Sequence, residues 1–401
     1  MLDSAPQFGE GLLAPDALSV DIARLAPGVV ELRRDLHQNP ELAFKETRTA
    51  ALIAERLGKA GYRVEAEVGG TGVVATLEGV SPGPTLMIRA DIDALPVTEL
   101  TGLPFASKNG NMHACGHDGH IAIAVGAAEI LSKYRNSLRG ALKFVFQPAE
   151  EITQGALAML GDRALAGLTP DRVIGLHIWN RLPAGHVLVN QSTVFASADA
   201  IRITVKGRGG HGAMPHLAVD PVVAAALVVA NAQTVVSREV PPNEMGVLTF
   251  GQIHGGSAPN VIADQVTIEG TVRAYRPEVR SLILAAAKRV AIETARSVRA
   301  EAVFERLYGS PPVVNNPEVA SWLGAVARQI VGDGRVGEHD PVSVGDDMAE
   351  FLNRAPGCYF MLGGGRPGAE NHHNARFDFD EACLPVGVEV FVRAALDYLG
   401  A

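Results

Sequence analysis

Three neighbouring stretches decide the fold: TLMIRA at residues 85–90, HIAIAVGAAEILSKY at 120–134 and ALKFVF at 141–146. The first and third are short apolar runs, as buried strands are. The middle stretch contains the longer apolar run IAIAVGAAEIL, which predicts a buried helix. Strand, helix and strand in this order are typical of an open α/β sheet.

The same alternation continues outward from this core. Helices are expected at 22–38 and 46–60, and a strand at 173–178. The pattern changes near residue 196, where strand, helix, strand, strand, helix and strand follow one another over about 110 residues. That order predicts a small α+β fold of the ferredoxin-like type, after which the α/β pattern resumes.

The sequence therefore predicts an α/β fold with an open mixed sheet, interrupted by a smaller α+β ferredoxin-like domain. The expected boundaries are 1–195 for the first part of the larger domain, 196–308 for the insertion and 309–401 for the second part. The insertion carries a long helix and an edge strand, which favour a role in dimerisation. The first 15 or so residues are expected to be a loose leader.

Composition excludes several classes of function. The chain has 401 residues, a formal net charge of −9 and three cysteines. An acidic chain without a stripe of Lys and Arg is unsuited to nucleic acid or to anionic membranes. No apolar run of about 18 residues predicts a transmembrane helix, and no signal peptide is expected. Three cysteines do not suggest a disulfide scaffold, so we expect a cytoplasmic protein.

The segment MHACGHDGH, residues 112–120, is the densest cluster of metal-ligand residue types. Thiolate and imidazole groups bind zinc and similar divalent ions. Cys115 and His117 are two residues apart, so in an extended stretch both side chains would point the same way. The alternative is a polar loop before a helix, with a structural cysteine.

A second segment, FQPAEE at residues 146–151, ends an apolar strand with two adjacent carboxylates. In extended backbone Glu150 and Glu151 would face opposite directions, so that one binds a metal while the other faces a bound water. That arrangement suits metal-assisted hydrolysis, in which a carboxylate relays the proton. The alternative is a solvated acidic turn, although the carboxyl end of a strand is the usual ligand edge of an open sheet.

Further candidates lie at the ends of other elements. His177 ends an apolar strand, where a lone histidine can also be a core residue. His372 and His373 lie in a loop before the last helix, and either could supply a ligand. Asp91 and Asp93 follow the strand at 85–90, where they could bind metal, orient a ligand or simply begin a turn.

The motifs MIRADIDALP, MHACGHDGH, FQPAEE, GLHIWN, GGHGAMPH, APNVIADQ and HNARF occur in this order. Together they resemble the amidohydrolases that include hippurate hydrolase, bacterial N-acyl-amino-acid aminoacylases and plant auxin–amino-acid conjugate hydrolases. These belong to the co-catalytic metallopeptidases that also contain glutamate carboxypeptidase. The resemblance runs from about residue 30 to the C-terminus. It implies a zinc-peptidase-like catalytic domain with an inserted domain.

The resemblance also implies a role for individual residues. The implied ligands of two divalent metal ions are Cys115, His117, Glu151, His177 and His373. Glu150 matches the general base, and Asp93 matches a carboxylate behind the ligands. His211 matches a histidine that reaches the substrate of a partner subunit, and it is preferred to His216. Asn260 and Arg273 match positions that contact the substrate near its carboxylate or oxyanion.

One segment departs from the family pattern. The family usually has Ser-Glu-Asp-Phe where this chain has Gly345-Asp346-Asp347-Met348. The carboxylates survive but the aromatic is lost, which could reshape a pocket wall. The proposed ligands and Glu150 are untouched by this change.

The resulting expectation is metal-dependent hydrolysis of the amide bond of N-acyl amino acids. The two metal ions would be zinc, manganese, cobalt or nickel, and the chain would form a homodimer or a higher homo-oligomer. On the same site, the alternatives are a dipeptidase or carboxypeptidase, or a deacetylase of an N-acetyl diamino acid. Outside the enzymes, the alternative is a binding protein that kept the fold and lost catalysis.

Overall fold

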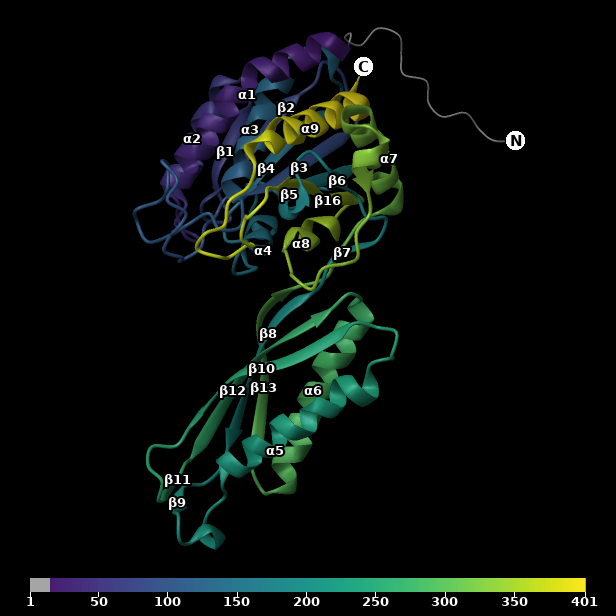
Figure 1. The fold of residues 1–401 in the computed structure, drawn as a ribbon. Coiled ribbons are helices and arrows are strands. Elements are labelled where there is room, and N and C mark those ends of the chain that lie inside the picture. The colour runs from purple at the N-terminus through teal and green to yellow at the C-terminus, as the bar shows by residue number, and fades with distance from the viewer. Residues whose placement is uncertain (1–14, 401) are drawn as a thin grey trace, which may run out of the picture. The chain divides into compact units, whose positions relative to one another are not determined.

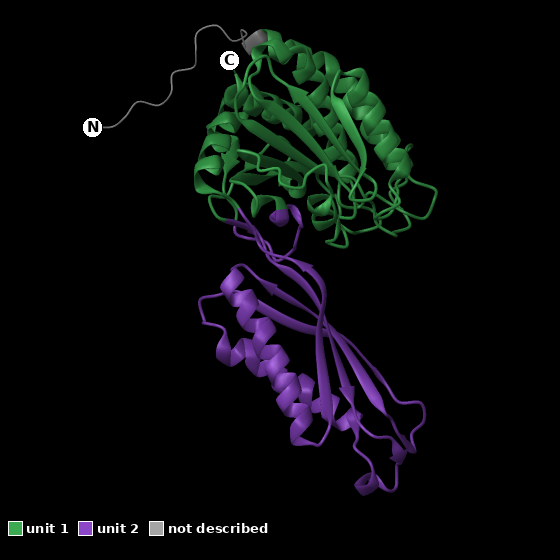
Figure 2. Cartoon of the chain, turned by 180° about the vertical axis from the view of Figure 1, so that it is seen from behind, with its two compact units in different colours: residues 1–192, 315–339, 351–401 green, residues 193–314, 340–350 purple. Residues whose placement is uncertain are grey.

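The computed structural model describes residues 15–400, so the expected leader at residues 1–14 lies outside the described residues. The chain forms two compact units (Figure 2). Unit 1 comprises residues 1–192, 315–339 and 351–401, and unit 2 comprises residues 193–314 and 340–350. The predicted insertion, 196–308, lies a few residues inside the main segment of unit 2 and leaves out 340–350. That short segment groups with unit 2, where Ala196 N–H donates to the carbonyl of Val342 at 3.0 Å.

Unit 1 is built on an eight-stranded mixed sheet with the order β1-β2-β4-β3-β5-β16-β6-β15 (Figure 1). Its strands are β1 (Arg63–Val68), β2 (Gly72–Glu78), β3 (Thr85–Asp91), β4 (Ala141–Gln147), β5 (Arg172–Pro183), β6 (Val187–Leu188), β15 (Val336–Gly337) and β16 (Gly357–Gly365). The central strands β4, β3, β5 and β16 run parallel to their neighbours in that group. Their carboxyl ends therefore meet at one edge of the sheet, where α/β proteins place their ligands.

Helices of unit 1 bury the sheet. They are α1 (Pro15–Gln38), α2 (Thr47–Lys59), α3 (His117–Lys133), α4 (Gly155–Gly161), α7 (Pro317–Val331) and α9 (Leu384–Leu399). Helix α3 packs on β3 and lies against α1 and α9, which accounts for its continuous apolar run. Gly126 is needed in this helix, because a Cβ there would lie 2.9 Å from Val29 Cγ2 of α1.

Unit 2 has a four-stranded antiparallel sheet of order β10-β12-β8-β13, with helices α5 and α6 packed against it. Along the chain these elements are β8 (Ala198–Lys206), α5 (Pro221–Thr234), β10 (Gly246–Gly255), β12 (Gln265–Ala274), α6 (Pro277–Ser297) and β13 (Glu301–Ser310). Numbered along the chain, the strands lie in the spatial order 4-1-3-2. The predicted mixed sheet with an inserted α+β ferredoxin-like fold is therefore confirmed.

Helix α5 has an unusual exposed apolar face. Together with the turn that follows it, the helix covers Pro221–Glu239, and this stretch is long and apolar enough to cross a membrane by length and composition. Buried helices of globular proteins pass the same test, yet only 33% of the residues in this window are buried. Val222, Val223 and Leu227 are among those exposed. The prediction that no helix is long and apolar enough to span a membrane therefore missed this stretch.

Candidate metal centre

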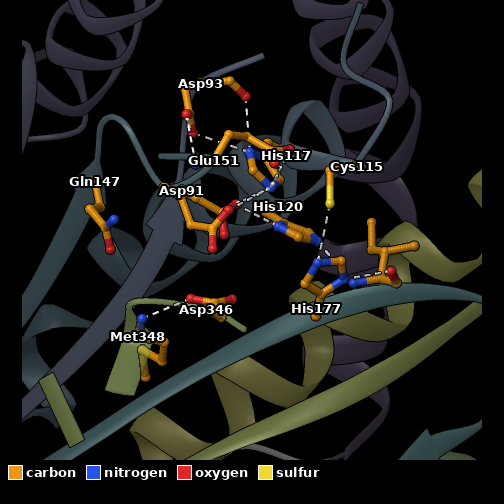
Figure 3. A network of polar contacts seen from close by, with 12 residues as sticks. Asp91, Asp93, Cys115, His117, His120, Gln147, Glu151, His177, Asp346 and Met348 are labelled. Carbon is orange, nitrogen blue, oxygen red and sulfur yellow. Dashed lines mark hydrogen bonds and ion pairs between the residues drawn. The ribbon is translucent and has the colours of Figure 1, made fainter. Parts of the chain in front are cut away.

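A cluster of polar side chains lies at the carboxyl edge of the central strands of unit 1 (Figure 3). Asp91 ends β3 and Asp93 follows it, while Glu150 and Glu151 follow β4. His177 lies in β5, and Cys115 and His117 stand at the start of α3. The loop that follows β16 adds His373. The sheet topology thus collects residues that lie up to about 280 positions apart in the sequence.

Cys115 and His117 converge through a turn, and not through the extended backbone that their spacing suggested. Gly116 between them has φ +88°, in the left-handed region that favours glycine, and His117 is the first residue of α3. The two side chains nevertheless lie close together. Ligand atoms of Cys115, His117 and His177 all lie within 4.8 Å of one another.

His117 is oriented by the backbone of Asp93. Its Nδ1–H donates to the carbonyl oxygen of Asp93 at 2.9 Å, which leaves Nε2 directed at the cluster. Nε2 lies 3.9 Å from Glu150 Oε2 and 3.9 Å from Glu151 Oε1. This nitrogen is buried and makes no hydrogen bond, as expected of a nitrogen that binds a metal ion.

His177 is oriented in a similar way. Its Nδ1–H donates to the carbonyl of Ile178 at 2.8 Å, and its Nε2 lies 3.5 Å from Cys115 Sγ. Burial holds the pKa of His177 well below its ordinary value, so the ring is neutral and can act as a ligand. His120 is different, because both of its nitrogens are engaged. Nε2 accepts from Ile178 N–H at 2.8 Å, and Nδ1–H donates to Asp91 at 2.6 Å.

Glu150 and Glu151 lie in a tight turn after β4. Glu151 N–H donates to Asp93 Oδ2 at 3.0 Å, so Asp93 contacts Glu151 through its carboxylate and His117 through its backbone carbonyl. Glu151 Oε1 is buried and makes no hydrogen bond. Burial raises the pKa of Glu151 to about 8, an effect that the neighbouring His117 reduces.

The structure separates the two histidines that follow β16. His373 Nε2 lies 3.3 Å from Glu151 Oε2, and its backbone has φ +66° with N–H donating to the carbonyl of Ala114 at 2.8 Å. His372 instead stacks on Trp179 with ring centroids 4.7 Å apart. Its Nε2–H donates to the carbonyl of Ile178 at 2.9 Å. Only His373 therefore joins the cluster.

The donor set fits divalent metal ions. Among the groups whose ligand atoms lie within 4.8 Å of one another are Cys115, His117 and His177; Cys115, Glu151 and His373; and His117, Glu150 and Glu151. Sulfur, imidazole and carboxylate together are the ligands of zinc and its neighbours. Burial raises the pKa of the Cys115 thiol and that of the Glu151 carboxyl, and a nearby cation would reverse both effects.

A buried arginine, which the sequence analysis missed, stabilises the edge. Arg89 donates from Nε to Gln147 Oε1 at 2.8 Å and from Nη1 to Asp91 Oδ2 at 2.6 Å. It thereby ties the ends of β3 and β4 together. A charged residue inside the apolar run TLMIRA was the available signal.

The candidates in the inserted fold lie at two ends of unit 2. His211 is in β9 (Gly210–His211), which pairs with β11 (Val261–Ile262), and Gly212 N–H donates to the carbonyl of Asn260 at 2.8 Å (Figure 1). Arg273 is near the far end of β12, opposite Val247. It lies eight positions after Gln265, the first residue of β12, a span of about 26 Å along the strand. Within one chain, Asn260 and Arg273 therefore do not meet.

The segment that departs from the family pattern starts a short helix. Asp346 Oδ1 accepts from Met348 N–H at 2.7 Å, at the beginning of α8 (Met348–Leu352). Gly345 packs against β8, where an added Cβ would lie 2.4 Å from Ala198 Cβ. The glycine at this position is thus required by close packing within unit 2.

Comparison with known proteins identifies the class. A family model described as peptidase family M20/M25/M40 matches residues 87–397. N-acetyl-L-cysteine deacetylase of Bacillus subtilis is 37% identical over 373 residues, which cover 93% of this chain and 88% of the relative. Thermostable carboxypeptidase 2 of Saccharolobus solfataricus is 36% identical over 394 residues, which cover 96% and 98%.

A solved structure agrees with these relatives. The crystal structure of a dinuclear metal binding peptidase of family M20 from Bacillus subtilis matches with a TM-score of 0.81 at 33% identity, over 94% of this chain and 99% of that one. The protein is accordingly a hydrolase that acts on amide bonds. It belongs to peptidase family M20/M25/M40, which confirms the resemblance drawn from the motifs.

Proposed function

We propose that this protein hydrolyses the amide bond of N-acyl amino acids with two divalent metal ions held by Cys115, His117, Glu151, His177 and His373. The observation that carries the proposal is the convergence of these donors beside Glu150 in one cluster, in which His117, His177 and Glu150 are buried and His373 is exposed. When bound, the metal ions would lower the pKa of a water molecule and polarise the acyl carbonyl. The relative of known structure is itself described as binding two metals.

Glu150 is the general base in this proposal. Its side chain is buried, and its Oε2 lies 3.9 Å from His117 Nε2. It accepts the proton of the attacking water as the new C–O bond forms at the acyl carbon. It then delivers that proton to the leaving nitrogen as the C–N bond breaks, which yields a carboxylic acid and an amino acid. A binding protein without catalysis would not need this carboxylate beside the ligands.

We propose that His211 and Asn260 act on the substrate of a second copy in a homodimer. Both lie at one end of unit 2, whereas Arg273 lies at the other end of β12. One substrate carboxylate could be reached by Asn260 and Arg273 only if they came from different chains. The exposed apolar face of α5 supports this association, as does β10, which pairs with β12 alone in the described sheet.

The amine side of the substrate is proposed to be an amino acid, with an acetyl or a longer acyl group. The similarity to a deacetylase favours a small acyl group. The similarity to a carboxypeptidase makes peptide hydrolysis the second candidate function. The thiol of Cys115 favours zinc over manganese, cobalt and nickel on grounds of softness. A cytoplasmic location is proposed because the three cysteines are free and buried.

The test is amine release from a panel of hippurate, N-acetyl and longer-acyl amino acids, and dipeptides. Each is incubated with metal-free protein to which zinc, manganese, cobalt or nickel is added, with metal content measured in parallel. Metal-dependent cleavage of acyl amino acids supports the proposal, and cleavage of dipeptides alone supports the peptidase. Two bound metals without any cleavage contradict the substrate class, and absence of bound metal contradicts the site.

A further inference from the structure

Glu46 occupies the position before α2 but does not cap that helix. Its backbone has φ −76° and ψ 43°, and its carboxylate makes no bond to the first amides of α2. Glu41 caps them instead, accepting from Arg48 N–H at 3.1 Å and from Thr49 N–H at 2.8 Å. The fully buried Glu46 carboxylate points elsewhere.

The carboxylate of Glu46 reaches the turn that carries Glu150. Its Oε1 accepts from Ala149 N–H at 2.9 Å, a contact between residues 103 positions apart. Its Oε2 accepts from the hydroxyl of Thr71, which lies in the turn between β1 and β2. Hydrogen bonds to an ionised carboxylate are about twice as strong as neutral ones, so this is a firm attachment.

The turn itself is strained. Ala149 and Thr153 both have φ +52°, in the left-handed region that alanine and threonine rarely occupy. Gly155 closes the turn, because an added Cβ would lie 1.5 Å from the carbonyl oxygen of Pro148. Such a conformation persists only where surrounding contacts hold it in place.

The amides on either side of Glu150 are both bound by carboxylates from distant elements. Ala149 N–H donates to Glu46, and Glu151 N–H donates to Asp93 at 3.0 Å. Asp93 also supports a metal ligand, whereas Glu46 contacts none. The contact between Glu46 and Ala149 is thus directed at the backbone that sets the direction of the Glu150 side chain.

We propose that Glu46 is a positioning residue, which holds the strained Ala149 backbone and so aims Glu150 and Glu151 at the metal centre. The inference rests on the proposed function for its catalytic consequence. A purely structural role would predict loss of stability alone. A positioning role predicts a change in the turn and in the chemistry that the turn carries.

Glu46→Gln is the decisive variant, because it keeps the volume but has one acceptor oxygen in place of two. If the amide oxygen faces Ala149, the bond from its N–H loses the carboxylate charge, and if the NH2 group faces Ala149, that bond is lost. Glu41→Gln is the matched control, since it changes the same residue type at the start of the same helix without touching the turn. Thr71→Val is the milder second variant, because it leaves the Glu46 carboxylate in place.

Hydrogen exchange of the peptide 146–155 in metal-free full-length protein reads the turn directly. We expect about tenfold faster exchange in E46Q than in E41Q or the wild type, with a smaller increase in T71V. Equal exchange in E46Q and E41Q would overturn the inference whether or not the protein cleaves N-acyl amino acids. A wild type that binds no metal would instead overturn the proposed function.

The metal-loaded protein gives two further readouts. For the panel substrate that the wild type cleaves, we expect E46Q to lower kcat about 10-fold to 100-fold while KM changes less than about threefold. The visible absorption of the cobalt-loaded protein should shift in E46Q and not in E41Q, since Glu151 lies in the same turn. A kcat and cobalt spectrum like those of the wild type, beside a lowered Tm, would also overturn the inference.

Discussion

The two units of the chain hold their candidate functional groups in opposite ways. In unit 1, His117 and His177 are each fixed through Nδ1 by a backbone carbonyl, and Glu151 is held through its amide by Asp93. In unit 2, His211 is exposed, and its ring accepts one bond from Ala213 N–H, two residues further along the chain. The residues of the metal centre are therefore held in place by contacts within unit 1, whereas His211 of unit 2 is exposed to solvent.

This contrast suggests a division of tasks. A metal centre needs its ligands fixed before the substrate arrives, because the reaction depends on orientation. Groups that contact a partner's substrate need exposure and a defined assembly. Unit 1 should thus keep its metal chemistry when unit 2 is altered, and unit 2 should act only in an oligomer.

The largest effect should come from Glu150→Gln. We expect kcat to fall about 10²–10⁴-fold, because the variant loses the group that accepts and returns the proton. Metal content should be unchanged, since the implied ligands remain. Steady-state kinetics and metal analysis of the variant check this. Loss of both metals in the variant would show that Glu150 is needed for metal binding and is not only a general base.

The second prediction tests, with mixed dimers, whether His211 of unit 2 acts on the substrate of the partner subunit. His211→Ala should lower kcat about 10²–10³-fold if the ring stabilises the oxyanion. Mixing E150Q and H211A subunits after dissociation should restore about a quarter of wild-type activity, because half of the dimers carry one site with both residues intact. No recovery in subunits shown to exchange would mean that His211 acts within its own chain.

A smaller effect should follow from a charge on the exposed face of α5. Val223 and Val20 are each 53% exposed on a helix, the first in unit 2 and the second in unit 1. Val223→Asp should weaken the dimer by about 10-fold or more and lower activity on dilution, because a buried charge opposes association. Val20→Asp is the matched control. Sedimentation velocity measures the dimer dissociation of both variants. Equal dissociation of the two variants would show that the interface does not include this face of α5.

The sequence predicted the architecture because burial leaves a strong pattern. The strands at 85–90 and 141–146 lie where apolar runs predicted them, since both strands are almost wholly buried. Strand β1 (Arg63–Val68) was missed, because it lies at the edge of the sheet, where only one of its six residues is buried and three are charged. The start of α3 was placed three residues late, at His120 in place of His117.

The supporting residues of the site could not be predicted in the same way. Glu46 and Ala149, or Arg89 and Gln147, are separated by 103 and 58 positions, and only the sheet order brings them together. The choice between His372 and His373 rested on the family resemblance. The structure gives the physical basis, because Trp179 stacks on His372 and leaves His373 beside Glu151.

The last prediction concerns stability within unit 1 alone. A buried network joins α1 to the start of α3, where His37 Nδ1 lies 2.8 Å from Asp118 Oδ2 and Nε2 lies 3.2 Å from Glu99. Arg33 donates to the same Asp118 oxygen at 2.8 Å. Burial alone would lower the pKa of His37, but Asp118 and Glu99 outweigh it and raise the pKa to about 9. The imidazolium is thus the stable form in the folded chain.

A raised pKa stabilises the fold where the unfolded chain would lose the proton. The contribution is complete below the ordinary histidine pKa of about 6.5 and disappears as the pH rises through about 9. The shift corresponds to a free energy on the order of 3 kcal/mol. In metal-free protein, the difference in unfolding free energy between the wild type and His37→Gln should therefore shrink between pH 6.5 and 9. Urea unfolding at both pH values measures it, and a difference independent of pH would mean that His37 is neutral in the network.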